Sequence, residues 1–111
     1  MNDTGPQVIA TRTYLLDGNA LTVSLFQPYL HRPGFYRCEY AIVTETKTIH
    51  HYVEGLDEID VVICALAMIG TNVSGLNEAI YHGRLHWVAG ESGDIGLPTI
   101  DDHWPFKKAS Q

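Results

Sequence analysis

DEIDVVICALAMIGTNV, residues 57–73, is the stretch that decides the fold of this chain. Asp57 suits the N-cap of a helix, and the helix dipole favours the acids Glu58 and Asp60 in the first turn. Large aliphatic side chains then recur at spacings of three and four, the period of one helix face: Ile59, Val62, Leu66, Ile69 and Val73. We therefore predict one main helix that buries this stripe on a sheet, with Ile63 and Ala65 widening it.

The end of this helix is predicted from its glycines. Gly70 weakens the helix interior, and Ser74-Gly75 is expected to break or end the helix. Residues 76–81 are expected to add one further helical turn, which Gly83 closes in the left-handed conformation.

Four extended runs precede the helix. Residues 7–16 and 19–27 flank Asp17-Gly18, a dipeptide typical of a tight hairpin turn. Residues 35–43 alternate most clearly, with Cys38 and Tyr40 on one face and Glu39 on the other. Residues 47–54 form a mixed fourth run, and 29–34 are predicted as a loop because Pro33-Gly34 signals a turn.

This order of elements predicts the α+β class. We expect a four- to five-stranded antiparallel meander sheet with one main α-helix packed on one face, because sequential strands usually pair. Residues 84–88 are the expected fifth strand. The chain is predicted to be a single domain over 1–111, with an ordered core at 7–98 and an aromatic C-terminal tail at 99–111.

Composition excludes several classes of protein. The 111 residues carry a net charge of −6 with only seven Lys and Arg, which argues against nucleic-acid binding. Two cysteines, Cys38 and Cys64, are too few for a disulfide framework and are expected to be buried thiols. Residues 1–7 lack a secretory h-region, and the apolar run 61–69 is short for a membrane span, so a cytoplasmic protein without a membrane partner is expected. No cofactor is predicted.

The six histidines raise the question of a metal site. His82 and His86 have the i, i+4 spacing that can bind zinc on one helix face, but Gly83 lies between them and a strand is expected at 84. His50 and His51 are adjacent in a strand run, so they point to opposite faces. We predict surface or hydrogen-bonded histidines, with a metal at His82 and His86 as the weaker alternative.

A glycine-rich loop at 90–96, GESGDIG, matches no phosphate, nucleophile or calcium motif. It is interpreted as a surface turn. His86, Glu91 and Asp94 lie close enough in sequence to meet there, and a histidine beside a carboxylate can act as a general base. The alternative hypothesis is therefore a small enzyme or ligand-binding protein that uses these three residues.

Aromatic residues outside the periodic runs favour partner binding instead. Tyr29, Trp104 and Phe106 are the predicted interaction residues, because interfaces are rich in aromatic side chains. A sheet with one helix also leaves a face and its edges to be covered. The preferred function is thus a non-catalytic protein-interaction module that is homodimeric or binds another protein.

Several short motifs, in a fixed order, resemble a small bacterial domain family of unknown function. They are ATRTY at 10–14 with LDG at 16–18, YRCEYAI at 36–42, GLD at 55–57, GRLHW at 83–87, GE at 90–91 and GLP at 96–98. Together they span most of 10–98. The resemblance implies a stand-alone bacterial domain and brings no activity, ligand or catalytic residue with it.

Overall fold

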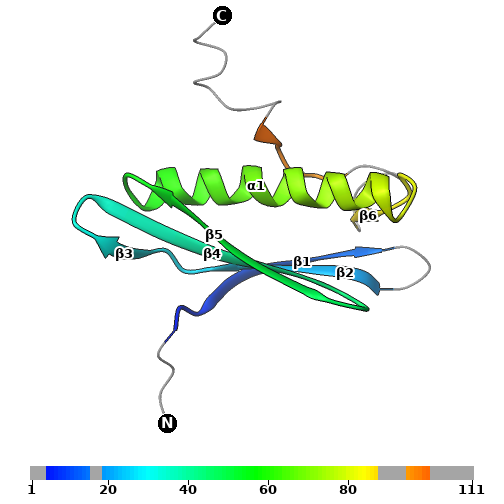
Figure 1. Cartoon of the computed structure of the whole chain (residues 1–111), viewed down its shortest axis with the longest axis horizontal. Helices are drawn as coiled ribbons and strands as arrows, with labels where there is room; N and C mark the ends of the chain where they lie inside the picture. Colours follow the sequence, from blue (N-terminus) through cyan, green and yellow to red (C-terminus); the bar gives the residue numbers. More distant parts are fainter. Residues whose placement is uncertain (1–4, 16–18, 88–94, 101–111) are drawn as a thin grey trace, which may run out of the picture.

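The computed structural model describes residues 5–15, 19–87 and 95–100. An antiparallel sheet carries a single long helix across one face, which confirms the α+β class (Figure 1). The elements are β1 (Val8–Leu15), β2 (Asn19–Phe26), β3 (Tyr29–Arg32), β4 (Phe35–Thr44), β5 (Thr48–Gly55), α1 (Glu58–Ala79) and β6 (His86–Trp87).

The sheet contains the predicted meander, because β1, β2, β4 and β5 pair in that order and all antiparallel. The short β6 pairs with β1 at the opposite end of the sheet from β5. β5 occupies one edge of β4, so β2 and β3 share the other edge, β2 along its second half and β3 along its first. The expected loop at 29–34 is therefore wrong in part: Tyr29–Arg32 is a strand, and only Pro33-Gly34 turns.

Alternation along the strands places the core between sheet and helix. Leu21, Val23 and Leu25 on β2 and Cys38, Tyr40 and Ile42 on β4 are all buried, as the sequence pattern predicts. The helix contributes a buried row at a spacing of four: Val61, Ala65, Ile69 and Val73.

Two residues of the predicted helix stripe face solvent instead of the sheet. Ile59 is 73% exposed and Ile63 47%, whereas Val61 is fully buried. The cause is the close approach of β5 to the first turn of the helix: a Cβ on Gly55 would lie 2.9 Å from the Val61 Cα. Because Val61 faces this backbone, Ile59 must point away from it.

Both ends of α1 are fixed by side-chain hydrogen bonds. Asp57 is the N-cap, as predicted, and its Oδ1 accepts from the Asp60 N–H at 2.8 Å. The helix does not break at Ser74-Gly75 but continues to Ala79. Asn77 is buried near its end, and its Oδ1 accepts from the Leu85 N–H at 2.9 Å. Gly83 has a φ of 76°, the left-handed conformation expected there.

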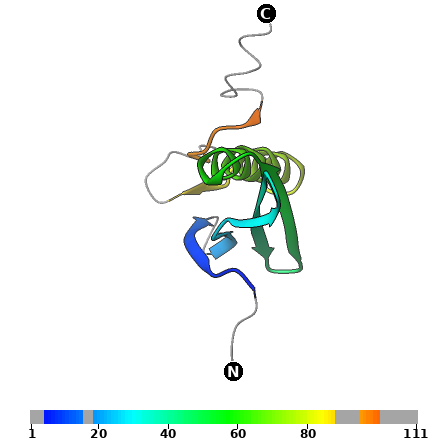
Figure 2. The same cartoon turned by 90° about the vertical axis from the view of Figure 1, so that its left-hand side faces the viewer.

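Residues 95–100, here called the strap, run from beside β1 onto α1, where Pro98 lies against Gly70. Figure 2 shows sheet, helix and strap as successive layers. The Tyr14 hydroxyl donates to the Ile95 carbonyl at 2.6 Å, and Arg12 Nη1 donates to the Gly96 carbonyl at 2.9 Å. Further along, the Ile100 N–H donates to Thr71 Oγ1 at 3.2 Å. The strap is thus bound both to β1 and to the helix.

Candidate functional site

The face of the sheet turned away from α1 carries a group of polar and aromatic side chains, here called the outer-face cluster. Its members are Tyr29 on β3, Arg37 and Glu39 on β4, and His50, Tyr52 and Glu54 on β5. The register pairs Arg37 with Glu54 and Glu39 with Tyr52. Since cross-strand partners share a face, and Cys38 and Tyr40 point to the core, these residues lie on the opposite side.

Glu39 is the centre of the first half of the cluster. The Tyr29 hydroxyl donates to Glu39 Oε2 at 2.7 Å, and His50 Nε2 lies 2.8 Å from Oε1. The hydrogen bond from Tyr29 is the largest cause that holds the pKa of Glu39 below its ordinary value, and the His50 contact adds to it. Burial, and then the bond to Glu39, raise the pKa of Tyr29. Glu39 is therefore ionised at neutral pH.

Glu54 is the centre of the second half. Arg37 Nη2 donates to Glu54 Oε2 at 2.8 Å, and Arg32 Nη2 lies 3.4 Å from Oε1. The Arg37 guanidinium also lies over the Tyr52 ring, 3.7 Å from its centroid, which is a cation–π geometry. The hydrogen bond from Arg37 lowers the pKa of Glu54. Both arginines of this region are thus directed to Glu54.

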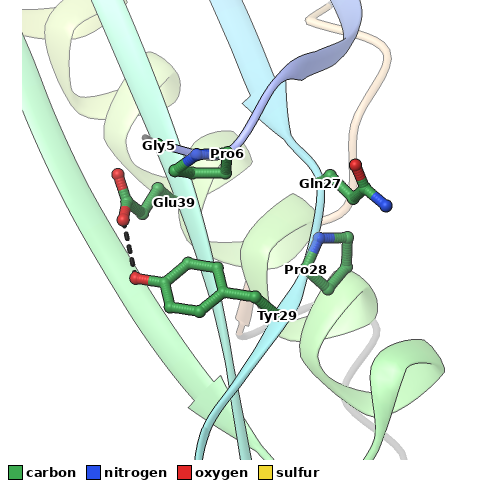
Figure 3. A pocket seen from close by; sticks show the side chains of 6 residues that line it. All are labelled: Gly5, Pro6, Gln27, Pro28, Tyr29 and Glu39. Atoms are coloured by element: carbon green, nitrogen blue, oxygen red, sulfur yellow. Dashed lines mark hydrogen bonds between the residues drawn. The ribbon is translucent and has the colours of Figure 1, made fainter. Parts of the chain in front are cut away.

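A hollow of about 600 Å³ opens beside Glu39. Figure 3 shows its lining: Gly5, Pro6, Gln27, Pro28, Tyr29 and Glu39. The incoming chain at 5–6 forms one wall and the bend between β2 and β3 another, held together by the bond from the Gln27 N–H to the Gln7 carbonyl at 2.8 Å. The hollow combines proline and tyrosine faces with one carboxylate.

Two further hollows are lined mainly by apolar residues. One of about 380 Å³ lies at the N-terminal end of α1, and its lining consists of Gln27, Pro28, Glu58, Ile59, Val62 and Ile63. The other, of about 260 Å³, lies between β5, the middle of α1 and the end of the strap, and Cys64 and Met68 line it.

The structure separates the histidines proposed for a metal. His82 follows α1 in a left-handed conformation with φ of 57°, and His86 lies on β6 opposite Leu15. They do not share a helix face, which the i, i+4 arrangement of zinc ligands requires. Within 5–15, 19–87 and 95–100, no group of three or more His, Cys, Asp or Glu side chains could hold a metal ion.

The other predicted residues have mixed outcomes. His86 Nδ1 lies 3.5 Å from the Arg84 carbonyl, while its proposed partners Glu91 and Asp94 lie outside the described residues. Tyr29 lines the largest hollow described above; Trp104 and Phe106 also lie outside the described residues. Cys38 is buried, as expected, and burial raises its pKa to about 11. Cys64 is partly buried.

Sequence reasoning missed Glu39 and His50 as members of a site. The outward orientation of Glu39 was visible in the alternation of 35–43, and His50 was visible as one of two histidines on opposite faces. Their meeting depends on the pairing of β4 with β5, which places Ala41 opposite His50. No motif in the sequence encodes that register.

Comparison with known proteins identifies a family. The family model described as "Domain of unknown function (DUF6968)" matches residues 10–99, which includes α1 and all the strands except the first residues of β1. Neither the curated proteins nor the solved structures contain a match to the chain. The family match confirms the expected kinship with a family of unknown function, over nearly the span that the motifs indicated. The chain therefore belongs to the DUF6968 family of domains of unknown function.

Proposed function

We propose that this domain is a non-catalytic protein-interaction module that forms a homodimer through the apolar N-terminal end of α1. The contact surface, here called the helix-end patch, consists of Pro28, Ile59, Val62 and Ile63. The observation that carries the proposal is the exposure of two large aliphatic side chains, Ile59 at 73% and Ile63 at 47%, in one hollow. Contiguous apolar surface of this kind marks interaction sites on soluble proteins.

The composition of α1 supports the same conclusion. By length and composition alone the helix would suit a membrane span, yet only 33% of its most apolar window is buried in the fold. Large apolar surface on a helix is stable in water only when something covers it. The sheet covers one side and the strap part of another. The helix-end patch is apolar surface that neither of them covers.

A second copy is the partner that fits this surface best. An isologous contact brings the same patch together from both subunits, so the patch must be complementary to itself. Aliphatic side chains meet that condition, and among the described residues that line the hollow Glu58 is the charged one. Two chains of net charge −6 would repel through most other surfaces.

Sedimentation velocity from low to high micromolar concentration tests the proposal. The wild-type chain is expected to dimerise with increasing concentration, and the double variant Ile59→Gln/Ile63→Gln to stay monomeric, since glutamine keeps the helix and the net charge. Ile80→Gln is the matched control, because Ile80 is 49% exposed at the other end of α1. A wild-type chain that stays monomeric at high micromolar concentration overturns the proposal, as does a double variant that dimerises like the control. A monomer that instead binds phosphatidylcholine vesicles through these two isoleucines also overturns it.

A further inference from the structure

The two carboxylates of the outer-face cluster, Glu54 and Glu39, differ in how many cationic side chains contact them. Arg32 and Arg37 both contact Glu54, so that carboxylate has two cationic partners. Glu39 has the Tyr29 hydroxyl and His50, and the latter is a cation only when protonated. Over the described part of the chain, no Lys or Arg side chain forms a salt bridge with Glu39. Its side chain is 22% exposed, and the attraction of Arg37 acts on it without a direct salt bridge.

The hollow beside Glu39 provides room and suitable walls for a cation. Tyr29 extends its ring toward the carboxylate, and Pro6 and Pro28 lie on either side of the space in front of it (Figure 3). A tyrosine face attracts cations through its quadrupole, and flat proline and tyrosine surfaces accept an aliphatic chain.

We propose that this hollow binds a primary ammonium group carried on an aliphatic stem. The ammonium nitrogen donates to the carboxylate of Glu39, and the stem lies against the Tyr29 ring and the two prolines. This chemistry is shared by free alkylamines and by the lysine side chains of other proteins. Glu39 lies on the outer face of the sheet, and the site adjoins the helix-end patch, with which it shares Gln27 and Pro28.

The hydrogen bonds already present favour an ammonium over a guanidinium. A guanidinium binds a carboxylate best as a fork that takes both oxygens at once. Here Oε2 already accepts from Tyr29, and Oε1 already has His50. An ammonium is a point charge that needs a single lone pair, and each carboxylate oxygen has two. Arg37 attracts Glu39 without a direct salt bridge, because its guanidinium donates to Glu54 and lies over the Tyr52 ring.

Titration of the full chain with n-butylammonium chloride, followed in ¹H–¹⁵N NMR spectra, tests the proposal. The amide signals of Gln27, Tyr29 and Glu39 are expected to shift and saturate, whereas n-butanol, which has the same stem without the charge, leaves them in place. Glu39→Gln keeps an acceptor for Tyr29 and is expected to weaken binding about tenfold or more, because one charge-assisted hydrogen bond is lost. Glu78→Gln on the exposed side of α1 is the matched control with the same change in net charge.

The two sources of the ammonium are distinguished by a second titration with a glycine peptide that contains one lysine. Tighter binding of this peptide than of butylammonium supports the proposal with a protein partner as the source, and weaker binding supports it with a free amine. The absence of saturable shifts with butylammonium overturns the proposal, as do equal shifts with butanol, a comparison that needs no variant. Unchanged affinity in a folded Glu39→Gln chain also overturns it.

Discussion

Gly70 offers a direct test of whether the strap is held against the helix. It lies inside α1, and a Cβ at this position would collide with the Pro98 carbonyl and come within 3.3 Å of the Leu97 Cβ. In a helix with nothing against it, replacing an interior glycine with alanine stabilises the protein by about 1 kcal/mol. In this fold the same methyl group must displace the strap. The sign of the effect of Gly70→Ala therefore depends on the strap.

The expected change in the free energy of unfolding follows from the contacts that the strap loses when it moves. The hydrogen bond from the Ile100 N–H to Thr71 Oγ1 is worth about 1 kcal/mol. Leu97 packs partly buried against the core, and exposing half of a leucine costs about 1 kcal/mol more. Local steric repulsion during partial displacement adds about 1 kcal/mol. After the gain in helix propensity, Gly70→Ala is expected to lower the free energy of unfolding by about 2 kcal/mol.

Urea denaturation followed by far-ultraviolet circular dichroism measures this difference. Gly75→Ala is the matched control: Gly75 lies in the same helix, and a Cβ added to it would meet no described atom within 4 Å, so the same replacement should stabilise by about 1 kcal/mol. The expected result is that Gly70→Ala lowers the free energy of unfolding and Gly75→Ala raises it. If Gly70→Ala stabilises the chain as much as Gly75→Ala does, the strap does not lie on the helix, and the layered arrangement is wrong.

Two further predictions concern titrating groups. Tyr29→Phe removes the hydrogen bond that contributes most to holding the pKa of Glu39 below its ordinary value, so ¹³C NMR titration of the Glu39 carboxyl should show a higher pKa; an unchanged value would contradict the assigned cause. Burial raises the pKa of Cys38 from 9.0 to about 11, so the unfolded chain releases this proton first as the pH rises. The free energy of unfolding is thus expected to fall between about pH 9 and pH 11, by about 2 kcal/mol more in the wild type than in Cys38→Ala. Urea denaturation at several pH values measures it, and an equal fall in the two proteins would refute this prediction.

The strands and the start of the helix could be predicted because their signals are local. Cys38 and Glu39 alternate between core and outer face, and alternation with a period of two indicates a strand with one buried face. Asp57 caps the helix through a bond to the Asp60 N–H, which a short sequence window contains in full. These features depend on neighbours within a few residues, so no tertiary contact had to be known.

The register of the helix could not be predicted in the same way. Residues 59–69 are apolar at nearly every position, so periodicity does not distinguish a stripe through Ile59 from one through Val61. The choice is made by Gly55, whose backbone approaches Val61 closely. Tertiary packing also explains why Gly75 does not end α1. Val73 and Asn77 are buried on either side of it, and their packing outweighs the propensity cost of one glycine.

The outer-face cluster shows why sequence alone could not identify Glu39 as a carboxylate without an arginine salt bridge. In the sequence, Glu39 and Glu54 are equivalent: both are strand carboxylates with a tyrosine nearby. Pairing of β4 with β5 makes them different, because it puts Glu54 opposite Arg37 and Glu39 opposite Tyr52. A shift of one residue would turn every side chain of β5 to the other face and remove both ion contacts. The carboxylate available to a ligand is therefore created by strand register, and register here follows from burying Ile49 and Val53 against the core.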